Sequence, residues 1–335
     1  MPLIILGILN FNLSNMLIIN ESALAQLTDW SSLIDQMIIA MTAYEDGDFV
    51  MPDRITMGFS NNTLLLMPAQ SGKYFSTKLV SLFPDNPSKN EPVIKGIVVL
   101  NNGDNGEPLA VINGAKLTAI RTAAVSAAGI RYTTPEHISS LGLIGAGVQG
   151  MHQVLAACKV RPIKNIYILD KYAERALSFI ACLASSLPDV QMLRVSTSEE
   201  LLEHSEVIIT ATNSNKPVLP DEADLLRNKH IIAIGSYKPQ MRELPDSLFK
   251  LIDHCFVDVR FALEESGDLI HPIEMGLLKQ KQVIPIGSLI RGKVTADTQG
   301  TTLFKLVGMA LFDLYTAKWF YEKAIRLDAG ENVNF

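Results

Sequence analysis

The sequence predicts an α/β protein that combines a doubly wound, parallel Rossmann sheet with a second α/β region. Three observations support this prediction. The chain has 335 residues, which is long for one hydrophobic core and favours two domains. Between residues 139 and 259, short apolar runs alternate with helical or polar segments, a rhythm typical of parallel sheets. A glycine-rich turn at residues 145–150 follows the first of those runs.

The composition is that of a well-buried globular chain, with 48% hydrophobic and 19% charged residues. The net charge of −6 is spread without any basic block, so a nucleic-acid partner is not expected. Cys158, Cys182 and Cys255 lie far apart, and the six histidines are scattered. This pattern predicts no metal site and no disulfide framework, and it favours the reducing cytoplasm.

The first nineteen residues are apolar but are interrupted by asparagines and a serine. They have no basic start and no small-residue cleavage site, so they do not resemble a signal peptide. The run is also too broken to span a bilayer, and no membrane association is expected. We expect Met16 to be the natural start and residues 1–15 to be an upstream extension.

The first half of the chain changes from helical to strand-like patterning. Residues 20–45 have a helical pattern, in which Asp29 is the expected N-cap of the second half. Five β-rich runs then alternate with turn residues, which predicts a largely antiparallel sheet. An alanine-rich helix is expected over residues 114–132. The five runs are residues 55–59, 62–69, 73–82, 95–102 and 108–113.

Residues 133–135 (Thr-Thr-Pro) are predicted to be a linker into the Rossmann region. Six strands are expected after it, and the alternation implies that they run parallel. A final long helix is predicted over residues 301–325, and it could return to the first domain. The six strands are residues 139–145, 165–170, 191–195, 206–212, 230–236 and 254–259.

The glycine-rich turn has the full context of a dinucleotide site, because it stands between a strand and a helix. Gly145 permits the tight turn, Gly147 lets the backbone approach a pyrophosphate, and Gly150 lets the helix pack closely. The residues between them, Val148 and Gln149, would lie at the start of that helix. An ordinary βα turn is the alternative interpretation.

Asp170 stands twenty residues after Gly150, at the end of the next strand. A carboxylate there accepts hydrogen bonds from the adenosine ribose, which favours NADH. Lys171 and Arg175 flank it and could instead hold the 2′-phosphate of NADPH, or they could be plain surface charges. The choice between NADH and NADPH therefore stays open.

The carboxyl ends of two later strands are expected to line the other half of the cofactor. In an open parallel sheet these ends face the ligand crevice. Ordinary turns at strand ends are the alternative. The residues concerned are Thr210, Ala211, Thr212, Ile234 and Gly235.

Seven stretches together resemble the ornithine cyclodeaminase/mu-crystallin family. They are FSTKLVSLFP, LAVINGAKLTAIRTAAVSA, LGLIGAGVQG, EVIITAT, GSYKPQMREL, VDVRFALEESGDL and GTTLFKLVGMALFDL, and they extend in order from about residue 20 to 325. The resemblance implies a substrate-binding and dimerisation domain of residues 16–130 with 310–335, and a Rossmann domain of residues 131–309. It also implies a homodimer that binds its small substrate between the domains.

The same resemblance suggests roles for five residues. Arg54 and Arg121 would clamp an α-carboxylate, a task suited to the planar guanidinium. Lys78 would lie near the reacting nitrogen or the carboxylate and is the candidate acid, and a lysine inside a strand-like run is unusual for a solvated charge. Thr122 would join Arg121 at the cofactor, and Glu265 would lie near the ligand. Singly, each could also be a surface residue.

One departure distinguishes between the family's activities. Ornithine cyclodeaminases carry an aspartate where this chain has Tyr237, so the expected base of cyclodeamination is missing. The segment instead resembles the ketimine-reducing branch. It implies reduction of 1-pyrroline-2-carboxylate to L-proline, or of 1-piperideine-2-carboxylate to L-pipecolate. The alternatives are cyclodeamination, oxidation of an amino acid as in alanine dehydrogenases, and a non-enzymatic role in binding NADPH or another ligand.

Overall fold

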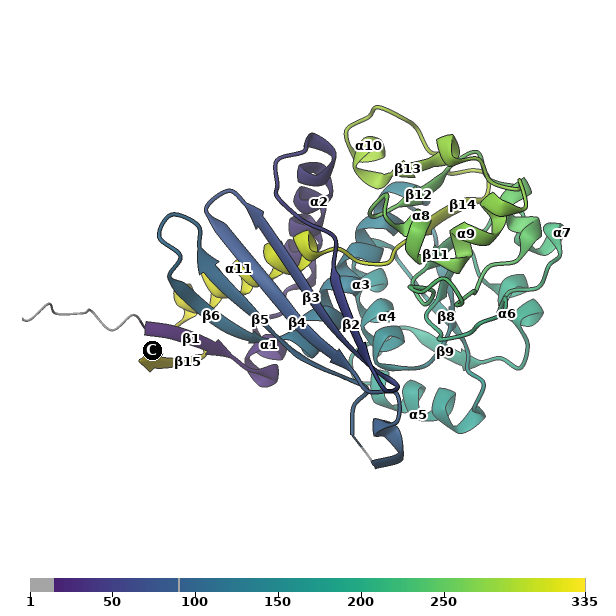
Figure 1. Ribbon diagram of the computed structural model, residues 1–335. Coiled ribbons are helices and arrows are strands. Elements are labelled where there is room, and N and C mark those ends of the chain that lie inside the picture. Colours follow the sequence, from purple (N-terminus) through teal and green to yellow (C-terminus); the bar gives the residue numbers. More distant parts are fainter. Residues whose placement is uncertain (1–14, 90, 335) are drawn as a thin grey trace, which may run out of the picture.

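The computed structural model describes residues 15–89 and 91–334 and contains two β-sheets (Figure 1). The first sheet has seven strands, in the order β15-β1-β6-β5-β4-β3-β2. All neighbouring strands are antiparallel except β1 and β6, which are parallel. The strands are β1 (Asn15–Ile19), β2 (Ile55–Phe59), β3 (Asn62–Ser71), β4 (Tyr74–Leu82), β5 (Ile94–Asn102), β6 (Pro108–Asn113) and β15 (Glu331–Asn334).

Helices cover one face of this sheet. The long helix α11 (Ala310–Leu327) lies across β3, β4 and β5, and α2 (Trp30–Asp46) packs against it. In β4, alternation along the strand buries Ser76, Lys78 and Val80 on the helix side, while Leu79 faces the other side. This alternation, together with the position of α11, places a lysine in the interior. The shorter elements of this region are α1 (Glu21–Leu27) and η1 (Asn86–Lys89).

The second sheet has eight strands, all parallel, in the order β13-β12-β14-β11-β10-β7-β8-β9. The strand order reverses between β7 and β10, and this switch point is where open α/β sheets bind ligands. The strands are β7 (Ser140–Ile144), β8 (Asn165–Leu169), β9 (Gln191–Arg194), β10 (Val207–Thr210), β11 (His230–Ala233), β12 (Cys255–Val257), β13 (Val283–Pro285) and β14 (Thr302–Lys305).

Helices and short turns connect these strands. The helix α3 (Gly114–Thr133) lies between the two sheets and contacts both, β5 on one side and β11 and β14 on the other. Its Gly129 faces the ring of Phe304 so closely that a Cβ would lie 2.1 Å from the ring. The remaining elements are α4 (Val148–Val160), α5 (Ala173–Leu183), α6 (Ser198–His204), α7 (Ala223–Leu226), η2 (Asp246–Lys250), α8 (Ala262–Glu265), α9 (Gly267–Glu274), η3 (Gln280–Gln282) and α10 (Ile286–Ile290).

The predicted fold class is confirmed, since a parallel Rossmann sheet accompanies a largely antiparallel one. All five predicted strands of the first region and all six of the second are present. Residues 20–45 form two helices, and Asp29 precedes the second without capping its backbone, because its carboxylate accepts from Ser32 Oγ. The linker begins one residue later than expected, since Thr133 ends α3.

The helix predicted over residues 301–325 is wrong at its start. Thr302–Lys305 form β14, in the interior of the parallel sheet between β11 and β12, and α11 begins at Ala310. A short apolar run that is buried on both faces has no periodicity to separate a strand from a helix. Gly308, at φ +83°, has a left-handed conformation between the two elements, which a helix could not continue through.

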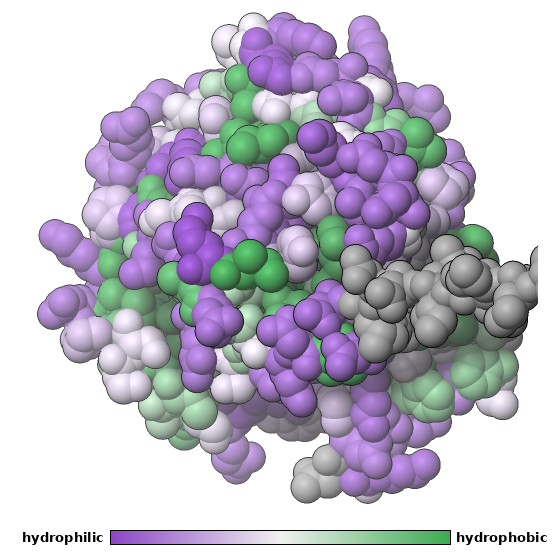
Figure 2. Space-filling view, turned by 90° about the vertical axis from the view of Figure 1, so that its left-hand side faces the viewer, coloured by the Kyte–Doolittle hydropathy of each residue, from purple (hydrophilic) through white to green (hydrophobic). Residues whose placement is uncertain are grey.

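The strand β1 was not predicted; it pairs with β6 and β15 at the edge of the first sheet. The prediction of an upstream extension concerns residues that lie outside the described part, apart from Asn15, the first residue of β1. Within the described ranges, no helix is long and apolar enough to cross a membrane. Figure 2 shows one side of the molecule, where hydrophobic residues form small, separate patches in a mostly hydrophilic surface.

Candidate active site

The glycine-rich turn between β7 and α4 has the geometry of a phosphate cradle. Gly145 has φ +107°, and a Cβ on it would lie 2.6 Å from the carbonyl oxygen of Ala211. A Cβ on Gly150 would lie 2.4 Å from Gly145 O, so the helix packs directly on the turn. Gly147 has no protein atom within 4 Å of its Cβ position, and it caps α4 without a side-chain bond. The N-terminus of α4 therefore faces open space of the kind a pyrophosphate fills.

Asp170 follows β8 and lies beside this turn. Its carboxylate accepts hydrogen bonds from the backbone of Ala146 and of Tyr172, both at 2.9 Å. Arg175 Nη1 lies 3.9 Å from Asp170 Oδ1, and the charged ends of Arg175 and Lys171 lie over the Tyr172 ring. The acid and the two basic residues thus lie together beside the turn, in which Val148 is 70% exposed.

The predicted strand-end residues meet at the carboxyl edge of the second sheet. Thr210, Ala211 and Thr212 continue from β10, and Ala211 packs against Gly145. Ile234 and Gly235 continue from β11, and a Cβ on Gly235 would lie 2.1 Å from Thr212 O. The two segments are therefore in direct contact with each other and with the glycine turn.

A second group of charged residues lies between the sheets. Lys78 Nζ on β4 lies 2.6 Å from Asp313 Oδ2, and Arg121 Nε on α3 lies 3.0 Å from Asp313 Oδ1. All three side chains are buried. Asp313, on α11, thereby joins a strand and two helices, and it leaves the terminal nitrogens of Arg121 facing Gly308. Gly308 has φ +83°, a conformation that strains any other residue, and a Cβ on it would lie 2.8 Å from Arg121 Nη1.

Arg54 approaches the same glycine from the other side. Its Nη2 donates to Gly308 O at 2.7 Å, and its Nε lies 2.9 Å from Glu265 Oε1 on α8. The buried carboxylate of Asp258 accepts from the backbone N–H of Val307 and of Gly308 and so holds this segment. Arg54, Lys78 and Arg121 are thus gathered around the connection between β14 and α11.

A cavity of about 300 Å³ opens beside Arg54. The first sheet supplies one wall through residues such as Thr56 and Leu65, and Tyr237, Gln240 and Glu265 supply the other. A smaller cavity of about 30 Å³ adjoins Arg54 and includes Met67, which pairs directly with Lys78. The space between the domains is therefore lined by guanidinium, carboxyl and phenol groups.

Burial shifts the pKa of Lys78 in the buried cluster and of two groups that line the cavity, Glu265 and Tyr237. It lowers the pKa of the Lys78 ammonium to about 8, and Arg121 adds to this effect, although the attraction of Asp313 opposes it. Burial raises the pKa of the Glu265 carboxyl to about 7, against the attraction of Arg54. Both groups therefore titrate close to neutral pH. Burial also raises the pKa of the Tyr237 hydroxyl, which keeps it neutral.

Four residues that hold the site together were not predicted from the sequence: Asp313, Asp258, Gly308 and Glu243. An acid inside the apolar segment MALFDLY could have indicated that Asp313 is buried. Its partners, Lys78 and Arg121, could not have been identified, because they lie far away in the sequence. Glu243 belongs to the quoted segment GSYKPQMREL, where nothing distinguished it from a surface acid. Over the described residues, no group of three or more histidine, cysteine or acidic side chains could hold a metal.

A parallel Rossmann sheet with a glycine-rich turn at its switch point defines a dinucleotide-binding α/β protein, and this chain also contains a buried cluster of basic residues. The family model for the ornithine cyclodeaminase/mu-crystallin family matches residues 15–327. The chain belongs to this family.

Three relatives illustrate the similarity. A Delta(1)-pyrroline-2-carboxylate reductase from Bacillus cereus is 30% identical over 96% of this chain and 100% of its own. The structure of a Thermococcus litoralis Delta(1)-pyrroline-2-carboxylate reductase, in complex with NADH and L-proline, has a TM-score of 0.90. It is 30% identical and covers 95% of this chain and 100% of its own. An archaeal alanine dehydrogenase dimer with bound NAD has a TM-score of 0.88 and is 26% identical. The match covers 96% of this chain and 100% of that one.

Replacing Asp313 with Asn tests the charge balance of the buried cluster. The substitution leaves Lys78 and Arg121 buried without a counter-ion, so the free energy of unfolding should fall by about 3–5 kcal/mol. Urea denaturation measures it. Asp224→Asn is the matched control, because the Asp224–Arg227 pair is exposed and should contribute nothing measurable. Equal, small effects of the two substitutions would contradict this account.

Proposed function

We propose that this chain is an NAD(P)H-dependent reductase of cyclic imino acids, converting 1-pyrroline-2-carboxylate to L-proline. One observation carries the proposal: the guanidinium groups of Arg54 and Arg121 meet at Gly308 beside a cavity, and Arg121 shares the buried Asp313 carboxylate with Lys78. Relatives that span this chain nearly end to end carry the same activity in their names. The six-membered 1-piperideine-2-carboxylate is a second substrate of the same chemistry.

In this proposal Arg54 and Arg121 bind the substrate carboxylate. Asp313 engages only Nε of Arg121, and Glu265 and Gly308 engage Nε and Nη2 of Arg54. Each guanidinium therefore keeps N–H groups for an incoming anion, in a setting where charge-assisted bonds are strong. Because these pairs already fix both guanidiniums, little side-chain entropy is lost when a carboxylate binds.

Lys78 supplies the proton. When bound, the reduced dinucleotide supplies a hydride, which together with one proton converts the C=N bond into CH–NH. Lys78 is buried beside the guanidiniums, and its pKa near 8 keeps much of it protonated at neutral pH while leaving it acidic enough to donate. Asp313 orients the ammonium and limits the fall in its pKa.

The cofactor residues follow from the cradle. Gly145, Gly147, Val148, Gln149 and Gly150 would bind the pyrophosphate, and the carboxyl ends of β10 and β11 would line the nicotinamide half. Asp170 would accept from the adenosine ribose, and its charge beside Arg175 opposes a 2′-phosphate. We therefore expect NADH to be preferred over NADPH.

The chain is proposed to act as a homodimer through the uncovered face of the first sheet. Ile55, Leu66, Leu79 and Ile97 stand directly opposite one another on four neighbouring strands and form an apolar row. Ile55, Leu79 and Ile97 are each at least 40% exposed, so the row is one that a second copy could cover. A cytoplasmic location is proposed from the three free cysteines.

An absorbance assay at 340 nm tests the proposed reaction. With 1-pyrroline-2-carboxylate, NADH should be consumed in step with L-proline formed, and faster than NADPH. Piperideine-2-carboxylate tests the preference for ring size. Ornithine with NAD is the comparison, because cyclodeamination would release ammonia without a net change in absorbance. Ammonia from ornithine, with no oxidation of NADH by either imine, would contradict the proposal and favour the lyase.

Replacing Lys78 with Met tests the proton donor. Because general acids contribute roughly 10²–10⁴-fold to rates, kcat should fall at least about a hundredfold while NADH affinity stays within about twofold. In the unmodified enzyme, kcat should fall about tenfold per pH unit above pH ~8, since the ammonium is lost there. Lys73→Met, on the exposed turn before β4, is the control. Near-normal turnover of the Lys78 variant would remove it from this role.

Sedimentation equilibrium tests the dimer. The mass should be twice the 36.8 kDa of one chain. Leu79→Lys places a charge in the apolar row and should produce single chains, because an unpaired buried charge is costly. A single-chain mass for the unmodified protein would contradict the dimer without affecting the proposed reaction.

A further inference from the structure

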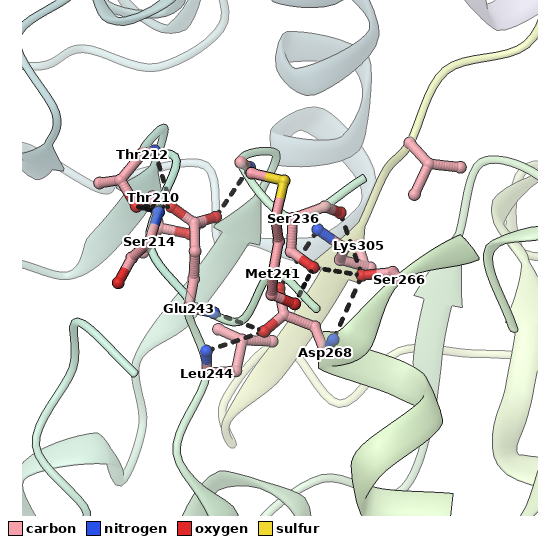
Figure 3. Close-up of polar contacts among 12 residues, drawn as sticks. Thr210, Thr212, Ser214, Ser236, Met241, Glu243, Leu244, Ser266, Asp268 and Lys305 are labelled. Atoms are coloured by element: carbon pink, nitrogen blue, oxygen red, sulfur yellow. Dashed lines mark hydrogen bonds and ion pairs between the residues drawn. The ribbon is translucent and has the colours of Figure 1, made fainter. Parts of the chain in front are cut away.

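Another buried charged cluster lies beneath the carboxyl edge of the second sheet (Figure 3). Glu243, Asp268 and Lys305 are each fully buried, with none of their surface exposed. None of them has a part in the proposed reaction. Burying three charged groups is costly unless each is hydrogen-bonded or paired, so the partners of each group indicate what the cluster holds in place.

The Glu243 carboxylate receives four hydrogen bonds from the two strand ends. Oε1 accepts from the backbone N–H and the hydroxyl of Thr212, both at 2.7 Å. Oε2 accepts from Thr210 Oγ1 at 2.9 Å and from the backbone N–H of Gly235 at 2.7 Å. A single carboxylate therefore ties the end of β10 to the end of β11 (Figure 3).

These tied segments are the ones that touch the phosphate cradle. Ala211, between the two threonines, packs on Gly145, and Gly235 fits against Thr212 with no room for a Cβ. Glu243 itself is fully buried, so it cannot contact a ligand bound in the crevice. Its effect on any ligand must therefore pass through the positions of Thr212 and Gly235.

The other two charges hold Glu243 in place. Asp268 Oδ1 accepts from the backbone N–H of Glu243 at 2.7 Å and of Leu244 at 2.9 Å. Its Oδ2 pairs with Lys305 Nζ at 3.3 Å, and Lys305 comes from β14. The ends of β10 and β11 are thus bonded directly to the Glu243 carboxylate, and β14 is connected to the Glu243 backbone through Lys305 and Asp268.

We propose that Glu243 is a positioning residue for the nicotinamide half of the cofactor. By holding Thr210, Thr212 and Gly235, it sets the backbone against which the nicotinamide riboside lies, while the adenosine half depends on Gly147 and Asp170. This inference rests on the proposed function, because it assumes a nicotinamide dinucleotide in the crevice. It adds a role for a residue that touches neither cofactor nor substrate.

The carboxylate is needed for this arrangement because two of its four donors are backbone N–H groups. Those groups can only donate, whereas the two hydroxyls can also accept. A glutamine has one acceptor oxygen, so its NH₂ group must face Thr212 N–H or Gly235 N–H. One strand end then loses its partner and moves.

The test measures binding rather than turnover, with two probes. NADH spans the whole crevice, and ADP carries the adenosine and both phosphates but lacks the nicotinamide riboside. In Glu243→Gln, the Kd for NADH should rise about tenfold or more, as expected when a buried N–H is orphaned. The Kd for ADP should change less than about threefold, because Gly147 and Asp170, on which the adenosine half depends, make no bond with Glu243.

Glu206→Ala is the control. Oε2 of Glu206 accepts from the backbone N–H groups of Ser139 and Ser140 and from the Ser140 hydroxyl, so this truncation removes all three bonds. It lies at the opposite, amino end of the same sheet, just before β10. Any loss that follows from weakening the sheet as a whole should appear in this variant too, whereas the proposal expects both Kd values to stay close to those of the unmodified protein.

The outcomes separate the proposals. Equal losses of NADH and ADP affinity in Glu243→Gln, or unchanged NADH affinity, would overturn the positioning role alone. If the unmodified chain bound neither probe, the proposed function would fail as well. If Glu243→Gln does not fold, Thr212→Val removes one of the four bonds and should weaken NADH but not ADP. An equal effect of Thr212→Val on both probes counts against the role.

Discussion

The carboxylate of Asp313 is the interaction on which the interior of this protein depends. It lies on α11 and holds Lys78 of β4 and Arg121 of α3 by ion pairs of 2.6 and 3.0 Å. Without it two cations would be buried together, at a cost of several kcal/mol. The two ion pairs also connect β4 of the first sheet to α3, the helix that packs on β11 and β14 of the second sheet. The pairing that neutralises the buried charges therefore also helps to hold the two sheets in place.

The two halves of the proposed active site are built on different principles. The cofactor half uses backbone: glycines at the turn, strand ends, and a helix N-terminus that binds anions through N–H groups. The substrate half uses side chains, which are held by acids on other elements. Arg54 depends on Glu265 and Gly308, and Arg121 depends on Asp313. Such pre-set groups are well suited to anchoring a small carboxylate, because little has to be ordered when it binds.

Carboxylates recur as connectors throughout the molecule. Asp258 holds the backbone at Gly308, Asp313 holds the basic cluster, and Glu243 holds the strand ends at the cofactor crevice. Each is fully or almost fully buried, and each is surrounded by backbone N–H groups, hydroxyls or cations. Burial raises the pKa of Glu243 and of Asp258, while their hydrogen bonds act in the opposite direction. The positions of the reactive groups therefore depend on acids that do not themselves react.

The sequence by itself determined the fold class, eleven of the strands and the phosphate turn, because alternation, helical periodicity and glycine spacing are local properties. It also singled out Arg54, Lys78 and Arg121, through a resemblance carried by short segments. It misassigned β14, since a short apolar run buried on both faces has no period that identifies it as a strand. Only the tertiary structure decided which acids accompany those basic residues. Asp313 lies 235 residues from Lys78 in number (313 − 78), and no local pattern encodes a pair that forms only when α11 crosses the first sheet.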